Sequence, residues 1–77
     1  MDYDPDKVDD TVLALLFLTM HDDSTRAWKG HDSGALDRLH QKGFIANPKN
    51  KNKSVVITDE GRVRAEHLFH ELFGKTS

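Results

Sequence analysis

The sequence has 77 residues, no cysteine and a formal net charge of −2 at pH 7. This length predicts one domain, and the lack of cysteine excludes a disulfide framework and any metal site built on thiolates. The longest apolar run, residues 12–18, is well short of the ~20 residues that a membrane-spanning helix needs. The first residues are acidic where a signal peptide is basic, so we expect a cytoplasmic protein.

The charges are distributed unevenly along the chain. Residues 1–23 contain seven aspartates and one lysine, whereas residues 24–55 contain seven bases and two acids. The basic middle segment predicts a surface that attracts phosphates. A mixed charged surface that only keeps the protein in solution accounts for the same pattern, so both interpretations stay open.

The first predicted helix begins at Asp4 and Pro5, because aspartate caps the free N–H groups and proline suits the first helical position. Apolar residues then recur at spacings of three and four up to Met20, and we expect the helix to end near His21. Its second half is apolar almost all round. This pattern predicts a helix that is buried in the core or against a second subunit.

The short segment of residues 25–30 contains the single tryptophan, Trp28, with Arg26 and Lys29 on either side. We predict that it is extended and pairs beside a later hairpin, although a single helical turn is the alternative. Two interpretations of Trp28 compete. A core tryptophan whose indole N–H is satisfied locally is favoured over an aromatic surface on which unpaired nucleobases stack.

A second helix is predicted from Asp32 or Ser33, either of which can cap it, to Gly43, whose left-handed conformation ends helices. A β-hairpin follows. Its first strand begins at residues 44–45, its turn covers residues 47–53, and its β-branched return strand covers residues 54–57.

The final predicted helix is capped by Thr58 and ends at Gly74. Its apolar faces are expected to contain Val63, Ala65, Leu68, Phe69, Leu72 and Phe73. Two leucines and two phenylalanines within six residues predict a homodimer through Leu68, Phe69, Leu72 and Phe73, and simple packing against the first helix is the alternative. The fold class is therefore α+β, in the order helix, short segment, helix, β-hairpin, helix.

Two segments of the chain resemble winged helix-turn-helix regulators of the MarR and PadR types. Residues 36–45 are similar to the end of a recognition helix that runs into a wing strand, and residues 57–61 are similar to the junction after the wing. The whole chain also resembles a small family of uncharacterised bacterial proteins, which brings no known activity with it.

The resemblance implies a winged-helix-like domain that binds DNA. It places Ser33, Gly34, Asp37, Arg38 and Gln41 on the exposed side of the recognition-like helix and the three lysines of residues 47–53 on the wing. The predicted nucleic-acid-binding residues are Ser33, Arg38, Gln41, Lys42, Lys49, Lys51 and Lys53. Only about ten residues separate His21 from Asp32, which leaves no room for a supporting helix, so the helix-turn-helix is truncated.

Alternatives compete for the most important of these residues. Arg38 either reaches nucleic acid or pairs with an acid on the first helix or the wing, and the ion pair is favoured. The lysines of residues 47–53 either contact phosphates or protect the tip of a hairpin from aggregation. Asp37 would repel phosphates, which counts against the binding face.

The sequence contains no glycine-rich phosphate loop and no cysteine nucleophile, so we expect no enzyme and no cofactor. His67 and His70 are spaced for neighbouring turns of one helix, but two ligands do not make a metal site, and we expect none. The leading interpretation is a small dimeric nucleic-acid-binding or regulatory domain. The alternative is a protein-interaction adaptor that uses the same fold without nucleic acid.

Overall fold

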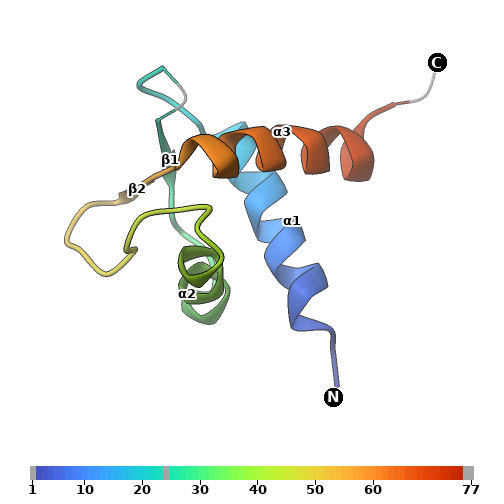
Figure 1. Ribbon diagram of the computed structural model, residues 1–77, viewed down its shortest axis with the longest axis horizontal. Helices are drawn as coiled ribbons and strands as arrows, with labels where there is room; N and C mark the ends of the chain where they lie inside the picture. Colours follow the sequence, from blue (N-terminus) through green and yellow to red (C-terminus); the bar gives the residue numbers. More distant parts are fainter. Residues whose placement is uncertain (1, 24, 76–77) are drawn as a thin grey trace.

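The computed structural model describes residues 2–23 and 25–75 (Figure 1). Helices and strands alternate along these residues, which confirms a small α+β fold. The elements are α1 (Pro5–Leu18), β1 (Arg26–Trp28), α2 (Ser33–Gln41), β2 (Ser54–Val56) and α3 (Asp59–Phe73).

Each helix begins at a side chain that accepts a hydrogen bond from an amide of the first turn. Asp4 accepts from the N–H of Asp6 at 2.9 Å, Asp32 from that of Ala35 at 3.0 Å, and Thr58 from that of Gly61 at 3.0 Å. These amides have no partner within the helix, so the caps satisfy them. The three predicted helix starts are confirmed, with Asp32 rather than Ser33 as the cap of α2.

The first helix ends earlier than the sequence predicts. It stops at Leu18, and His21 instead forms an antiparallel bridge with Arg26. Between them, Asp22 and Asp23 adopt left-handed φ angles of 54° and 59°, which aspartate tolerates better than most residues. The tight turn that they make returns the chain to β1, and this turn is the reason that the helix cannot continue to His21.

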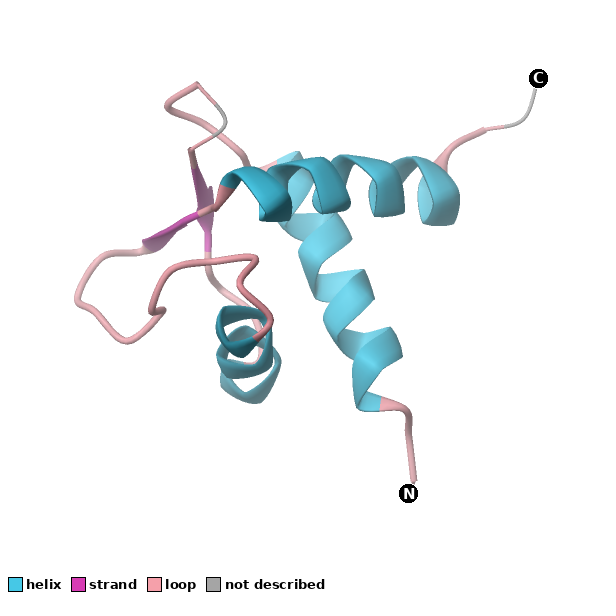
Figure 2. Ribbon diagram, in the orientation of Figure 1, coloured by secondary structure: helices cyan, strands magenta, loops and turns pink. Residues whose placement is uncertain are grey.

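The two strands form an antiparallel sheet in which Arg26 pairs with Val56, Ala27 with Val55, and Trp28 with Ser54. The prediction that residues 25–30 are extended and pair with the later segment is therefore confirmed. Figure 2 shows the sheet to one side of the helices, next to the N-terminal end of α3.

The predicted hairpin is only partly formed. Its return strand exists as β2, but its first strand is reduced to an isolated bridge between Ile45 and Ile57 and one hydrogen bond from the N–H of Ala46 to the carbonyl of Val56. Pro48, two residues after Ala46, lacks the N–H group that a further ladder bond would need. The chain therefore leaves the sheet as a long loop.

The core lies where α1 meets the other elements. Its fully buried large side chains come from α1, α2, β2 and the segment before the loop: Leu13, Leu16, Leu39, Ile45 and Val55. In Figure 1, α3 crosses the C-terminal half of α1, and the loop of residues 46–53 projects on the opposite side from the N-terminal end of α1. None of the described helices has the length and hydropathy that a membrane span requires.

The buried face of α3 is narrower than predicted. Gly61, Ala65 and Leu68 face the core, but Val63 is 57% exposed, so its assignment to an apolar packing face was wrong. The stripe at positions 61, 65 and 68 follows the helical spacing of three and four, and Val63 falls on the other side of the helix. The small residues Gly61 and Ala65 allow the helix to approach its neighbours closely.

This close approach makes Gly61 a sensitive position. A Cβ atom at Gly61 would lie 1.8 Å from the carbonyl oxygen of Phe44, whereas one at Gly30 would meet nothing within 4 Å. Gly61→Ala should therefore lower the free energy of unfolding by about 3 kcal/mol or more, because the backbone itself must move. Gly30→Ala, the matched control, should change it by less than ~0.5 kcal/mol. Urea denaturation measures both, and equal stabilities of the two variants would contradict the packing described here.

Candidate nucleic-acid interface

The basic loop, defined here as residues 47–53, is held in shape by a lysine outside it. The ammonium group of Lys29, just after β1, donates to the carbonyl oxygens of Pro48 at 2.6 Å and Asn50 at 3.1 Å, and to the side-chain oxygen of Asn50 at 2.9 Å. The backbone N–H of Lys29 also donates to the carbonyl of Lys53 at 3.1 Å. Lys29 is thus a structural cation. No local sequence pattern identifies this role, since its acceptors lie about twenty residues away.

The alternation of asparagine and lysine in the basic loop has a structural reason. The side-chain oxygen of Asn47 accepts from the N–H of Lys49 at 2.9 Å, and that of Asn50 accepts from the N–H of Asn52 at 2.8 Å. Such bonds from a side chain to the backbone two residues later stabilise turns. The asparagines therefore fold the loop, and the lysines between them remain on the surface.

The three lysines of the basic loop, Lys49, Lys51 and Lys53, are exposed. Within residues 2–23 and 25–75, none of them forms an ion pair with a carboxylate. Their charge is available to an external anion.

Two other predicted binding residues point the opposite way, toward α1. The Nε atom of Arg38 donates to both carboxylate oxygens of Asp9, at 2.9 and 2.8 Å. The Nζ atom of Lys42 lies 3.0 Å from Asp9 and 3.1 Å from Asp6. The interpretation that Arg38 pairs with an acid on the first helix is confirmed, and Lys42 does the same.

Asp9 is completely buried, and its environment determines its charge state. Burial by itself raises the pKa of the Asp9 carboxyl, but the hydrogen bonds and positive charges of Arg38 and Lys42 outweigh burial and hold that pKa below its usual range. The hydrogen bond to Asp9 raises the pKa of Arg38 in turn. The Nη2 atom of Arg38 is buried and has no hydrogen-bond partner among the described residues. The ion cluster that Asp9 forms with Arg38 and Lys42 is therefore charged at neutral pH.

The structure brings some of the other predicted residues together. A hollow of about 320 Å³ between the start of α2 and the basic loop is lined in part by Ser33, Asp37 and Lys49. A neighbouring hollow of about 220 Å³ is lined in part by Gln41 and again by Asp37 and Lys49. Ser33, Gln41 and Lys49 thus share one side of the molecule. Lys51 and Lys53 lie farther along the loop, and Arg38 and Lys42 face α1.

The favoured interpretation of Trp28 as a core residue was wrong. Trp28 is 52% exposed, and its ring stacks on that of His21 with a centroid distance of 4.9 Å and an interplanar angle of 30°. The reason is the strand register. Ala27 pairs with Val55, and both face the core, so the side chains on either side of Ala27 point to the outer face of the sheet.

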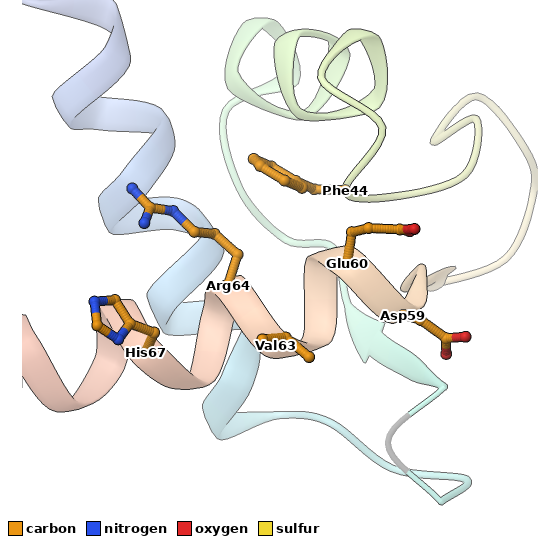
Figure 3. A pocket seen from close by; sticks show the side chains of 6 residues that line it. All are labelled: Phe44, Asp59, Glu60, Val63, Arg64 and His67. Carbon is orange, nitrogen blue, oxygen red and sulfur yellow. The ribbon is translucent and has the colours of Figure 1, made fainter.

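A hollow of about 600 Å³ lies along α3 and is lined by Phe44, Asp59, Glu60, Val63, Arg64 and His67. Figure 3 shows that all of these except Phe44 project from α3 and that Arg64 extends toward α1. Its lining combines two acids with an arginine and a histidine, so the hollow selects for neither sign of charge. Among the described residues, no group of three or more side chains is arranged to hold a metal ion.

The predicted dimer residues divide into two pairs. Leu68 is buried in the core, and Phe69 packs against Phe17 with ring centroids 5.2 Å apart. Leu72 and Phe73, one turn farther along α3, remain 49% and 47% exposed. The first pair is thus used within the chain, and only the second pair is free for a partner.

The comparisons with known proteins place the chain in a family. A family model described as "Domain of unknown function (DUF6429)" matches residues 4–75. The chain belongs to this family. The match to DUF6429 spans all the elements from α1 to α3, the basic loop included.

A relative from Sinorhizobium fredii, named "Uncharacterized protein y4hR", is 56% identical over 73 residues, which cover 95% of this chain and 97% of the relative. No solved structure matches the chain. The resemblance to a small bacterial family is confirmed by these matches.

The ion cluster of Asp9, Arg38 and Lys42 leads to a prediction about stability. Asp9→Asn should lower the free energy of unfolding at pH 7 by about 2–3 kcal/mol, because it leaves two cations without their shared anion. The cost is somewhat below that of a fully buried pair because Arg38 and Lys42 reach solvent. The control Asp6→Asn removes the exposed partner of Lys42 and should cost less than ~1 kcal/mol. Urea denaturation distinguishes the two, and equal costs would contradict the cluster.

The contribution of Asp9 to the free energy of unfolding should depend on pH, and the lowered pKa determines its direction. Because the folded pKa of Asp9 lies below 3.8, its stabilising contribution is complete above that pH and disappears as the pH falls through the folded pKa. The difference in stability between the parent protein and Asp9→Asn should therefore be constant near neutrality and shrink below about pH 4. A stability difference between the two proteins that grew as the pH fell would contradict a lowered pKa for Asp9.

The dimer remains a prediction that now depends on Leu72 and Phe73. Changing both to serine should raise the dissociation constant of the dimer by about tenfold or more, since apolar contacts at an interface are lost. Val63→Ser, on another exposed face of α3, should leave it unchanged. Sedimentation equilibrium measures the association, and a parent protein that is monomeric at high micromolar concentration would end the prediction.

Proposed function

We propose that this protein binds nucleic acid through the phosphate backbone, using the basic loop and the adjoining side of α2. The main observation behind the proposal is that the cations of this protein fall into two groups, those bonded within the protein and those exposed to solvent. Arg38 and Lys42 neutralise Asp9 on α1 and Lys29 is used to fold the loop, whereas Lys49, Lys51 and Lys53 are exposed and unpaired in the described structure. A set of free lysines on one projecting loop suits phosphates, which lysine binds as a point charge.

The arrangement of the elements supports a winged-helix-like interpretation of the fold. In it, α2 is the recognition-like helix, the basic loop is the wing, and Thr58 marks the junction to the last helix. The bridge between Ile45 and Ile57 closes the base of this wing. The region before α2 departs from the regulators, because a turn and β1 occupy the place of the supporting helix.

This departure favours contact with the backbone over reading of base edges. A recognition helix reads DNA with long polar side chains that reach the major groove. Here Arg38 and Lys42 are engaged with α1, and the exposed side of α2 offers Ser33, Asp37 and Gln41. Asp37 repels phosphate, so the favourable contacts are concentrated at the basic loop.

A protein-interaction adaptor is the second candidate function. It is favoured by the hollow of about 600 Å³ around Phe44 and Val63, since exposed apolar side chains within a polar rim are typical of protein interfaces. This function would not require the basic loop, which gives a means of separating the two.

The test is a salt titration by fluorescence anisotropy with labelled mixed-sequence oligonucleotides, single-stranded and duplex. Three phosphate contacts give a slope of about −2.7 for duplex in a plot of log affinity against log salt. Replacing Lys49, Lys51 and Lys53 with glutamine should bring the slope close to zero and weaken binding at low salt by about tenfold or more.

The control variant changes Lys7, Arg64 and Lys75 to glutamine, which alters the net charge equally but leaves the basic loop intact. It should retain most of the slope. No binding at low salt, or an equal loss in both variants, would reject the basic loop as the binding surface and favour the adaptor.

A further inference from the structure

The exposed Trp28 and the half-buried His21, which stack on each other, are both hydrogen-bonded to Thr19. The backbone N–H of Trp28 donates to the hydroxyl oxygen of Thr19 at 3.1 Å, and Nδ1 of His21 lies 2.9 Å from the carbonyl oxygen of the same Thr19. Because a carbonyl only accepts, Nδ1 of His21 carries the proton. One residue thus fixes the backbone of Trp28 and the ring of His21, and the two rings are stacked on each other before any ligand arrives.

This aromatic pair lies at the base of the basic loop. Trp28 pairs with Ser54 across the sheet, next to Lys53, and the following residue, Lys29, is bonded to the backbone of Lys53. On the same face, Nε of Arg26 donates to the hydroxyl oxygen of Ser54 at 2.7 Å, so a second cation flanks the tryptophan.

The charges around the pair differ between its two sides. Asp22 and Asp23 form the exposed turn that follows His21, whereas the lysines lie on the side of Trp28. A phosphate chain that passes over the pair is therefore repelled by the turn and attracted toward the basic loop.

We infer that the Trp28–His21 pair is a stacking site for an unpaired base and that the ligand of this surface is single-stranded nucleic acid. The inference rests on the proposed function, because the basic loop supplies the phosphate contacts. Within a duplex each base plane is covered by its neighbours and only edges are presented, so a flat aromatic surface gains little from double strands. An open strand offers base faces and phosphates together, and this surface matches both.

The ligand chemistry is shared by DNA and RNA, because a base face stacks equally well in either. The experiment therefore includes both types of strand.

Trp28 is the single tryptophan of the chain, so its fluorescence reports on the site directly. Titration of the parent protein with twelve-residue oligodeoxyuridylate and oligouridylate, which carry the same base and differ only in the sugar, should quench this fluorescence, and a twelve-base-pair duplex should not. We expect at least one of the single strands to bind about tenfold or more tightly than the duplex at equal salt. A difference between the two single strands identifies the preferred sugar, and either preference supports the inference.

The variant Trp28→Ala should weaken single-strand binding about 5- to 100-fold, measured by anisotropy, and leave duplex binding unchanged. The variant Trp28→Phe, which keeps an aromatic ring, should recover part of the loss. Val56→Ala is the matched control, because Val56 is also exposed on the outer face of this sheet but has no ring. Circular dichroism checks that each variant is folded, and quenching of the parent protein needs no variant at all.

Equal affinity for duplex and single strands, or binding of single strands without quenching, would overturn the stacking site. If that binding were still lost on changing the lysines of the basic loop, the proposed function would stand and this inference alone would fail. Absence of binding by every oligonucleotide at low salt would reject both.

Discussion

The rest of the structure depends on one buried carboxylate. Asp9 lies on the inner face of α1 without access to solvent, and an isolated charge there would be very unfavourable. Arg38 on α2 and Lys42, which caps the C-terminal end of α2, both reach it and fix the rotation of α2 about its own axis. The helix must turn these two positions toward α1, so Ser33 and Gln41 are left on the surface. The ion cluster therefore specifies which side of α2 faces outward.

The same cluster divides the charges of the molecule into two regions. The acidic start of α1 is balanced in part by the two bases of α2, so these bases add little positive potential outside. In the described structure no carboxylate forms an ion pair with the lysines of the basic loop, although Asp37 lines the same hollows as Lys49. A net charge of −2 is therefore compatible with a positive projecting loop, because the negative charge is concentrated on α1 and partly neutralised there. Lys29 contributes to the position of the positive charge, because its hydrogen bonds fix the projecting basic loop where a long ligand can reach the loop.

Local signals predicted the helices well, and contacts between distant residues account for the errors. The caps Asp4, Asp32 and Thr58 bond within three residues of themselves, so their sequence pattern is sufficient. Asp9 stood among several aspartates that the helix dipole already explained. A signal was nevertheless present, because Asp9 falls on the same stripe as Val12, Leu13 and Leu16, where a charge needs a buried partner.

Trp28 was misassigned because a strand of three residues has too few positions for alternation to show which side faces the core, and the pairing of Ala27 with Val55 decides it. The hairpin was overestimated for a similar reason. Residues 44–45 carry β-type side chains and begin to pair with the second edge of β2, but Pro48 stops this ladder.

The structure shows why the connection between α1 and α2 is short. Instead of a supporting helix, it forms a turn and a strand that hold His21 and Trp28 together through Thr19. Under the proposed function, a winged arrangement without a supporting helix loses the support from which a recognition helix reads the major groove. The same residues then provide an aromatic stacking surface beside the basic loop, and this exchange favours open strands over duplex as the ligand.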